Sequence, residues 1–109
     1  MHLSARRTTV AGRHVLVVEG DVDLATVPRF LDALTRLAAD AGGDTAVVDL
    51  DAAGNLDDTA LGLLLGAAGR ARAAGGDLAV VCTEPRLRRR LADNGFDRAV
   101  SVVASISAA

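Results

Sequence analysis

Apolar residues in this chain gather in short blocks, and the spacing within the blocks changes along the sequence. Three blocks are continuous, rich in Val and bounded by Gly or Asp; they cover residues 15–19, 46–50 and 78–82. Runs of this length and composition are typical of strands that are buried on both faces of a sheet. Weaker runs at 6–10 and 99–103 predict two further strands, and Ala11-Gly12 after the first of these indicates a hairpin turn.

The segment after the 15–19 strand has the 3.6-residue spacing of a helix. We expect Thr26 to cap this helix, Pro28 to lie in its first turn and Gly42-Gly43 to end it. Its apolar residues fall on one side and predict a buried face made of Phe30, Leu34, Leu37 and Ala38.

Two more helices are predicted after the next two strands. The first runs from about Asp58 to Ala73, and its expected buried residues are Leu61, Leu64, Leu65 and Ala68. The second begins at Pro85 and ends at Asn94-Gly95. Residues 101–109 are expected either to add a last helical turn or to fray.

The resulting order of elements is β-β-α-β-α-β-α-β. Strands that are joined through a helix are expected to run parallel, whereas the opening hairpin is antiparallel. This order predicts an α/β protein with a mixed sheet. A length of 109 residues is the usual size of one domain, so we expect a single domain over residues 1–109.

Composition excludes several functions. All 12 basic residues are Arg, so no Lys is available for a Schiff base or a phosphate-binding P-loop. Tyr and Trp are absent and the net charge is -2, which argues against nucleic-acid binding. No apolar run reaches ~18 residues, and the first residues lack the apolar stretch of a secretory signal. Together with Cys82 as the only cysteine, these features predict a cytoplasmic protein without membrane insertion.

Candidate catalytic groups are sparse. His2 and His14 have no Cys or acidic partner at metal-ligand spacing, and the serines lie near the termini, away from a His. The remaining candidate is an acidic group near one end of the sheet, made of Asp21, Asp23, Asp57 and Asp58. Without a Lys this group does not complete a phospho-aspartate site, so we predict no metal, no cofactor and no enzymatic activity. Weak nucleotide hydrolysis stays open as a hypothesis that only these acids support.

The third helix carries the densest charge cluster. Arg86, Arg88, Arg89 and Arg90 fan around the helix and are interrupted by Leu87, so we interpret them as a solvated helix face. Cys82, at the end of an apolar strand, is interpreted as a small buried hydrophobe.

One side of the Asp58–Ala73 helix is nearly bare backbone. Gly62, Gly66 and Gly69 share a sector with Asp58 and Thr59. Each glycine inside a helix costs roughly 0.8–1 kcal/mol relative to Ala, so the three cost about 2–3 kcal/mol. Either a partner needs close access to this side, or base composition supplied the glycines. Leu63, just beyond the glycine sector, is either an exposed apolar contact or packs on a neighbouring loop.

The polar residues at the start of the same helix have two possible roles. A carboxylate of Asp57 or Asp58 can accept backbone N–H bonds there, an effect of typically 0.3–1 kcal/mol. Free N–H groups at a helix start also stabilise a phosphate on a nearby hydroxyl, which makes Thr59 a candidate modification site.

The same residues carry a family resemblance. Val47-Val48-Asp49-Leu50, then Leu56-Asp57-Asp58-Thr59 and an apolar helix, resembles the STAS-domain signature, where a strand ending Asp-Leu leads to Asp-Ser-Ser/Thr-Gly-Leu-Gly. Gly20-Asp21-Val22-Asp23-Leu24 resembles the family's Gly-Glu-Leu-Asp segment. Gly75-Gly76 and Asn94-Gly95 also fall where that family turns. The resemblance implies a STAS-like α/β domain with a mixed sheet of four to five strands and helices packed mainly on one face.

Within this family the chain resembles bacterial anti-sigma factor antagonists, which implies partner switching. In such a switch the unmodified domain binds an anti-sigma factor of the histidine-kinase-like fold and frees a sigma factor. The kinase inactivates the domain by phosphorylating the Ser after the motif's leading Asp, and a phosphatase reverses this. The partner-binding residues that the resemblance implies are Asp21, Asp23, Asp57, Asp58, Thr59, Gly62, Leu63 and Gly66.

The match departs from the family pattern at the phosphorylated position. Asp57 matches the leading Asp and Asp23 the acid facing it, but Asp58 occupies the phosphoacceptor position. Asp cannot carry a stable phosphate ester, and it bears about one negative charge where phosphoserine bears about 1.5–2. Asn55 and Ala60 are further departures within the contact turn. Two hypotheses stay open: Thr59 is the acceptor, or Asp58 locks a phosphorylated-like state.

The alternative function that the fold allows is a STAS scaffold or accessory subunit of a multi-protein or lipid-transport complex, without a phosphorylation switch. The sequence leaves open whether the protein is a monomer or a weak dimer.

Overall fold

The computed structural model describes residues 3–109, so the expectation for His2 lies outside the described residues. Its elements follow the predicted order. They are β1 (Ser4–Val10), β2 (Arg13–Val22), α1 (Val27–Ala41), β3 (Thr45–Leu56), α2 (Asp58–Ala73), β4 (Asp77–Val81), α3 (Pro85–Asp93), α4 (Phe96–Ala99), β5 (Ser101–Val103) and a 3-10 turn, η1 (Ile106–Ala108).

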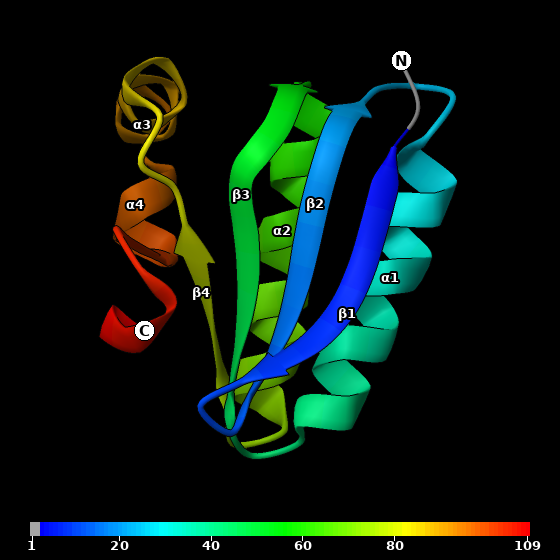
Figure 1. The fold of residues 1–109 in the computed structure, drawn as a ribbon, viewed down its shortest axis with the longest axis vertical. Helices are drawn as coiled ribbons and strands as arrows, with labels where there is room; N and C mark the ends of the chain where they lie inside the picture. The colour runs from blue at the N-terminus through cyan, green and yellow to red at the C-terminus, as the bar shows by residue number, and fades with distance from the viewer. Residues whose placement is uncertain (1–2) are drawn as a thin grey trace.

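The five strands form one sheet in the order β1-β2-β3-β4-β5 (Figure 1). β1 and β2 are antiparallel, and every later neighbouring pair is parallel, which confirms the predicted mixed sheet. The hairpin turn has positive φ at both central residues, 52° at Ala11 and 79° at Gly12. This is the backbone of a type I′ turn, whose twist matches that of the flanking strands.

The main helices cover one face of the sheet. Figure 1 shows α1 and α2 behind the strands and α3 and α4 beside β4. The main core lies between that face and the helices, and its largest fully buried side chains include Leu16, Leu50, Leu78, Phe30, Leu34 and Leu64. On the opposite face a smaller cluster of Val15, Val47 and Val81 is covered by Ile106 of η1. The expected arrangement, with helices mainly on one face, is therefore confirmed.

The buried face of α1 is as predicted, whereas that of α2 is not. Phe30, Leu34, Leu37 and Ala38 are all buried. In α2 the expected burial of Leu65 is wrong, because this side chain is 41% exposed. The buried residues of α2 are instead Ala60, Leu61, Leu64, Ala67, Ala68 and Ala71.

A shift of the buried arc of α2 explains the difference. The small alanines at 60 and 67 centre that arc on Leu64, and Leu65 projects about 100° from Leu64. Leu63 projects about 100° in the other direction; it is half-buried and packs against the main core. Leu65, not Leu63, is thus the exposed leucine of α2.

Both central strands are longer than predicted. β2 continues to Val22 and β3 to Leu56, so only Asp57 separates β3 from α2. The short helix α4 is an element that the sequence pattern did not indicate. It begins after Gly95, whose φ of 72° reverses the chain at the end of α3. The extra length of β2 and β3 decides where the acidic residues lie.

Candidate functional site

The predicted turn lies where the carboxyl ends of β2 and β3 meet. Val22 and Leu56, the last residues of these parallel strands, are paired in register. The Asp57 amide also donates to the Val22 carbonyl at 3.4 Å. The segments that follow the two strands therefore lie side by side. We call this region the turn surface and define it as residues 21–26 and 54–59 with the Gly62, Leu63 and Gly66 positions of α2.

Asp21 is held by β3. A register shift between Gly20 and Val22, with φ of 84° at Gly20, bends the end of β2. The Asp21 carboxylate accepts a hydrogen bond from the backbone N–H of Asn55 at 2.8 Å. A Cβ atom at Gly54 would overlap that carboxylate, so this close approach requires glycine. Asp21 thus ties the two strand ends together.

Asp23 organises the loop between β2 and α1. Its carboxylate accepts from the amides of Ala25 at 3.0 Å and Thr26 at 3.1 Å. Thr26 is the N-cap residue of α1, as predicted, but its hydroxyl makes no capping bond. That hydroxyl donates to the Asp21 carbonyl at 3.0 Å and accepts from the Asp23 amide at 2.9 Å. The loop is therefore a closed hydrogen-bonded unit.

Leu24 stands at the tip of this loop and is not among the predicted partner-binding residues. Its side chain is 90% exposed, far more than any other large hydrophobic residue among residues 3–109. The Asp23 turn uses the backbone on both sides of Leu24 and leaves its side chain in solvent. An apolar residue between turn-forming polar residues was the available signal.

Asp57 and Asp58 have different roles at the start of α2. Asp57 is the N-cap, with extended backbone, and its carboxylate accepts from the Ala60 amide at 2.9 Å. Asp58 is the first helical residue, and its side chain is 94% exposed. Of the two residues that could cap the helix, Asp57 does so.

The Asp58 carboxylate is paired with Arg90 of α3. The Nη2 atom of Arg90 lies 2.9 Å from Oδ1 of Asp58, and its Nη1 donates to the Leu56 carbonyl. Arg88 also bonds back to the protein, donating to the Cys82 carbonyl at 3.1 Å. The prediction that the α3 arginines form a solvated face holds for Arg86, Arg88 and Arg89, which are exposed, and fails for Arg90, which is partly buried. The side chains of Arg88 and Arg90 also reach carbonyl groups at strand ends, which a helical wheel cannot show.

The glycine side of α2 is open. A Cβ atom at Gly62 or Gly69 would meet nothing within 4 Å, and one at Gly66 would only touch Arg70 at 3.5 Å. Packing within residues 3–109 therefore does not require these glycines. Thr59, in the first turn, is exposed, and its hydroxyl has no hydrogen-bond partner in the described part of the chain.

A groove of about 370 Å³ borders the turn surface between β3 and α3. It is lined by Ala53, Gly54, Asn55, Leu56, Glu84, Arg86, Leu87 and Arg90. Both carboxylate oxygens of Glu84 are used, because they cap α3 through the amides of Arg86 and Leu87. Arg90 is engaged as well, so the side chains of Arg86 and Asn55 are the polar groups of this groove without a hydrogen bond among residues 3–109.

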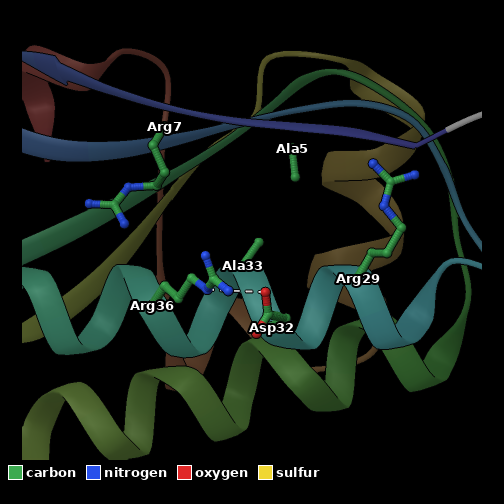
Figure 2. Close-up of a pocket in the computed structure, with 6 residues that line it drawn as sticks. All are labelled: Ala5, Arg7, Arg29, Asp32, Ala33 and Arg36. Atoms are coloured by element: carbon green, nitrogen blue, oxygen red, sulfur yellow. Dashed lines mark ion pairs between the residues drawn. The ribbon is translucent and has the colours of Figure 1, made fainter.

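A second hollow, of about 250 Å³, lies at the other edge of the sheet between β1 and α1 (Figure 2). Three arginines line it, but two of them are engaged. Arg7 bonds Asp40 at 3.0 Å, and Arg36 pairs with Asp32 at 3.1 Å. It shares no residue with the turn surface.

Within residues 3–109 no group of three or more His, Cys, Asp or Glu side chains is placed to hold a metal ion. Three of the four acids instead accept backbone N–H bonds, and the fourth pairs with Arg90. Cys82 is fully buried, as predicted, and burial raises the pKa of its thiol above the ordinary value. In the described residues no helix is long and apolar enough to cross a membrane.

This chain belongs to the STAS domain family, whose model matches residues 5–109. Among curated proteins no sequence matches it. An anti-sigma factor antagonist from Mycobacterium paratuberculosis superposes with a TM-score of 0.85 at 24% identity, over 97% of this chain and 89% of that one. The predicted family and fold are thereby confirmed.

Three further solved structures, of two proteins, share the fold. The Bacillus anti-sigma factor antagonist SpoIIAA, in its unphosphorylated form, has a TM-score of 0.69 at 16% identity, covering 95% of this chain and 91% of its own. Its phosphorylated form gives 0.67 at 17%, covering 96% of each chain. The murine anion transporter Slc26a9 gives 0.65 at 12%, covering 96% of this chain but 21% of its own. At such identities the likeness concerns the fold.

Proposed function

We propose that this protein is an anti-sigma factor antagonist that acts by binding, not by catalysis. Its partner would be a cytoplasmic anti-sigma factor of the histidine-kinase-like fold, bound through the turn surface. One observation carries the proposal: the STAS signature acids Asp23 and Asp57 organise adjacent loops beside an open glycine side of α2. The names of the similar solved structures support this class of partner.

The turn surface has the properties of a protein-binding site. Asp21, Asp23 and Asp57 fix its backbone, which reduces the entropy that is lost when a partner binds. Leu24 offers an exposed apolar side chain, and the open side of α2 allows a partner's backbone to approach closely.

Two matched variants test the proposal. Gly62→Gln and Gly69→Gln place the same side chain on the same open side of α2, about 10 Å apart along the helix axis. Both variants should fold, since neither position has a neighbour within 4 Å of the added Cβ. In affinity capture from the native cell, wild type and Gly69→Gln should recover a kinase-fold anti-sigma factor, and Gly62→Gln should not.

The result would count against the proposal if wild type recovers no kinase-fold protein, or if Gly62→Gln captures it as well as wild type does. Equal loss of capture by both glycine variants would place the interface at the middle of α2 and not at the turn.

For the phosphorylation switch we propose Thr59 as the acceptor and a phosphatase as the reversing enzyme. Thr59 is exposed, its hydroxyl is unbonded within the described residues, and it lies in the first turn of a helix. A phosphate there would be stabilised by the helix dipole and would add about 1.5–2 negative charges to the turn surface, which the partner contacts. Incubation with the captured kinase and ATP should add one phosphate by intact mass to wild type and none to Thr59→Val. An unmodified wild type would refute this step.

The second candidate is an accessory STAS subunit of a membrane-transport or other multi-protein complex. The fold shared with the anion transporter Slc26a9 favours it. The same capture experiment separates the two functions, because this one predicts recovery of membrane-transport subunits and no kinase. Neighbouring genes for a lipid transporter would point the same way, whereas sigma or anti-sigma genes favour the first candidate.

A further inference from the structure

The ion pair between Asp58 and Arg90 joins two segments that are 32 residues apart in the sequence. Arg90 contacts both sides of the β3–α2 junction at once. One nitrogen donates to the carbonyl of Leu56, the last residue of β3, and another to the carboxylate of Asp58, the first residue of α2. The Leu56 contact keeps the guanidinium at the helix start.

The two partners differ in exposure. The Asp58 side chain is 94% exposed, whereas that of Arg90 is 35% exposed and lies along the groove beside Leu56 and Leu87. The position of the guanidinium is thus set by the protein surface beneath it. A surface ion pair is worth only about 0–1 kcal/mol of stability. Its effect on the charge that a partner meets is larger, because a pair at 2.9 Å carries no net charge.

We propose that Arg90 cancels the charge of Asp58 and so keeps the turn surface in the state of an unphosphorylated antagonist. This inference rests on the proposed function and concerns its regulation. Of the two hypotheses for this helix start, phosphorylation of Thr59 and a phosphorylated-like state locked by Asp58, the ion pair favours the first. A phosphorylated-like lock needs a free negative charge at position 58, whereas the geometry presents a neutral pair there. Displacing Arg90 uncovers the carboxylate and weakens partner binding. The position of α3, which carries Arg90, therefore sets the charge at position 58 and with it the affinity for the partner.

A double-mutant cycle on positions 58 and 90 tests this, with the dissociation constant for the captured anti-sigma factor as the readout. Asp58→Asn alone should not weaken binding by more than about 3-fold, because it removes the negative charge and leaves Arg90 in place. Arg90→Gln alone should weaken binding about 10-fold, which corresponds to about 1.4 kcal/mol for one uncovered charge at an interface. The double variant should bind within about 3-fold of wild type, since no charge remains to be covered.

Arg89→Gln is the matched control. Arg89 is the neighbouring exposed arginine of α3 and takes part in no ion pair between residues 3 and 109. Its replacement removes the same charge from the same helix and should leave binding within about 3-fold of wild type. Equal weakening by Arg89→Gln and Arg90→Gln would overturn the proposal, because general loss of positive charge would then explain the effect.

A readout without any partner separates failure of this inference from failure of the proposed function. In the free protein, the carbon-13 resonance of the Asp58 carboxyl group should shift with Arg90→Gln and stay in place with Arg89→Gln. No shift with Arg90→Gln means that the pair is absent in solution, and the inference falls whatever the partner is. A double variant that binds about 10-fold more tightly than wild type also overturns it, since Asp58 then acts as an uncovered phosphate mimic in spite of Arg90. Absence of a kinase-fold partner refutes the proposed function instead.

Discussion

Asp57 caps α2 and also belongs to the proposed partner-binding surface. Substitutions can separate its contribution to stability from its contribution to binding. Asp57→Ala removes the carboxylate oxygen that accepts the Ala60 amide at 2.9 Å. Loss of an N-cap acceptor costs about 1 kcal/mol, and loss of a negative charge at the helix start adds about 0.3–1 kcal/mol. We expect the free energy of unfolding to fall by about 1–2 kcal/mol. With a slope near 1.5 kcal/mol per M of urea, the unfolding midpoint falls by about 1 M.

Asp57→Asn keeps an oxygen acceptor at the same place and removes only the charge. Because Asn caps helices about as well as Asp, this variant should lose no more than about 0.3–1 kcal/mol. Asp58→Ala provides the control at the next residue, where the side chain is 94% exposed and, among residues 3–109, pairs only with Arg90. Its cost should stay within the about 0–1 kcal/mol of a surface ion pair.

Urea unfolding followed by circular dichroism measures all three variants under one condition. Asp57→Asn that destabilises as much as Asp57→Ala would refute the capping argument, and so would Asp57→Ala with an unchanged midpoint. The same proteins can then be used in partner capture. If the Asp57 charge contacts the anti-sigma factor, Asp57→Asn loses capture while it retains most of its stability.

Further predictions follow from single contacts. Gly54→Ala should destabilise the protein by about 1–3 kcal/mol in urea unfolding. The new methyl group displaces the Asp21 carboxylate, which then loses its hydrogen bond from the backbone N–H of Asn55. An unchanged unfolding midpoint would contradict the close approach of Gly54 and Asp21. Gly62→Ala and Gly69→Ala should each stabilise α2 by up to about 1 kcal/mol, seen as a higher melting temperature, since both sites are open. Cys82 is the only side chain whose ordinary pKa lies between about 8 and 11, because the sequence has neither Lys nor Tyr. Because burial raises its pKa in the folded state, the thiol's contribution to stability is complete below about pH 9 and declines as pH rises further, by at most about 1.4 kcal/mol per pH unit. Cys82→Ala should remove this decline, and persistence of the slope in that variant would assign it to another group.

Local patterns predicted most elements of this protein for a physical reason. Apolar spacing reports which side of a segment can be buried, and caps and glycines report where it ends. The Asp58–Ala73 helix and the buried face of α1 therefore follow from neighbouring residues alone. The STAS resemblance rests on the same kind of information, because its motif lies on one strand, one turn and one helix.

The tertiary structure decided everything that depends on residues distant in the sequence. Arg90 reaches Asp58 from a helix 32 residues later, and Asp21 reaches the Asn55 amide from 34 residues earlier. Neither contact has a local spacing that a sequence pattern can show. The exposure of Leu65 depends on how α2 is rotated against its neighbours, which close packing of alanines at 60 and 67 sets. The sequence by itself determined the order of elements and the location of the turn. Packing between those elements determined which carboxylates of the turn are free, because only the folded chain brings the opposite charge of Arg90 within reach of Asp58.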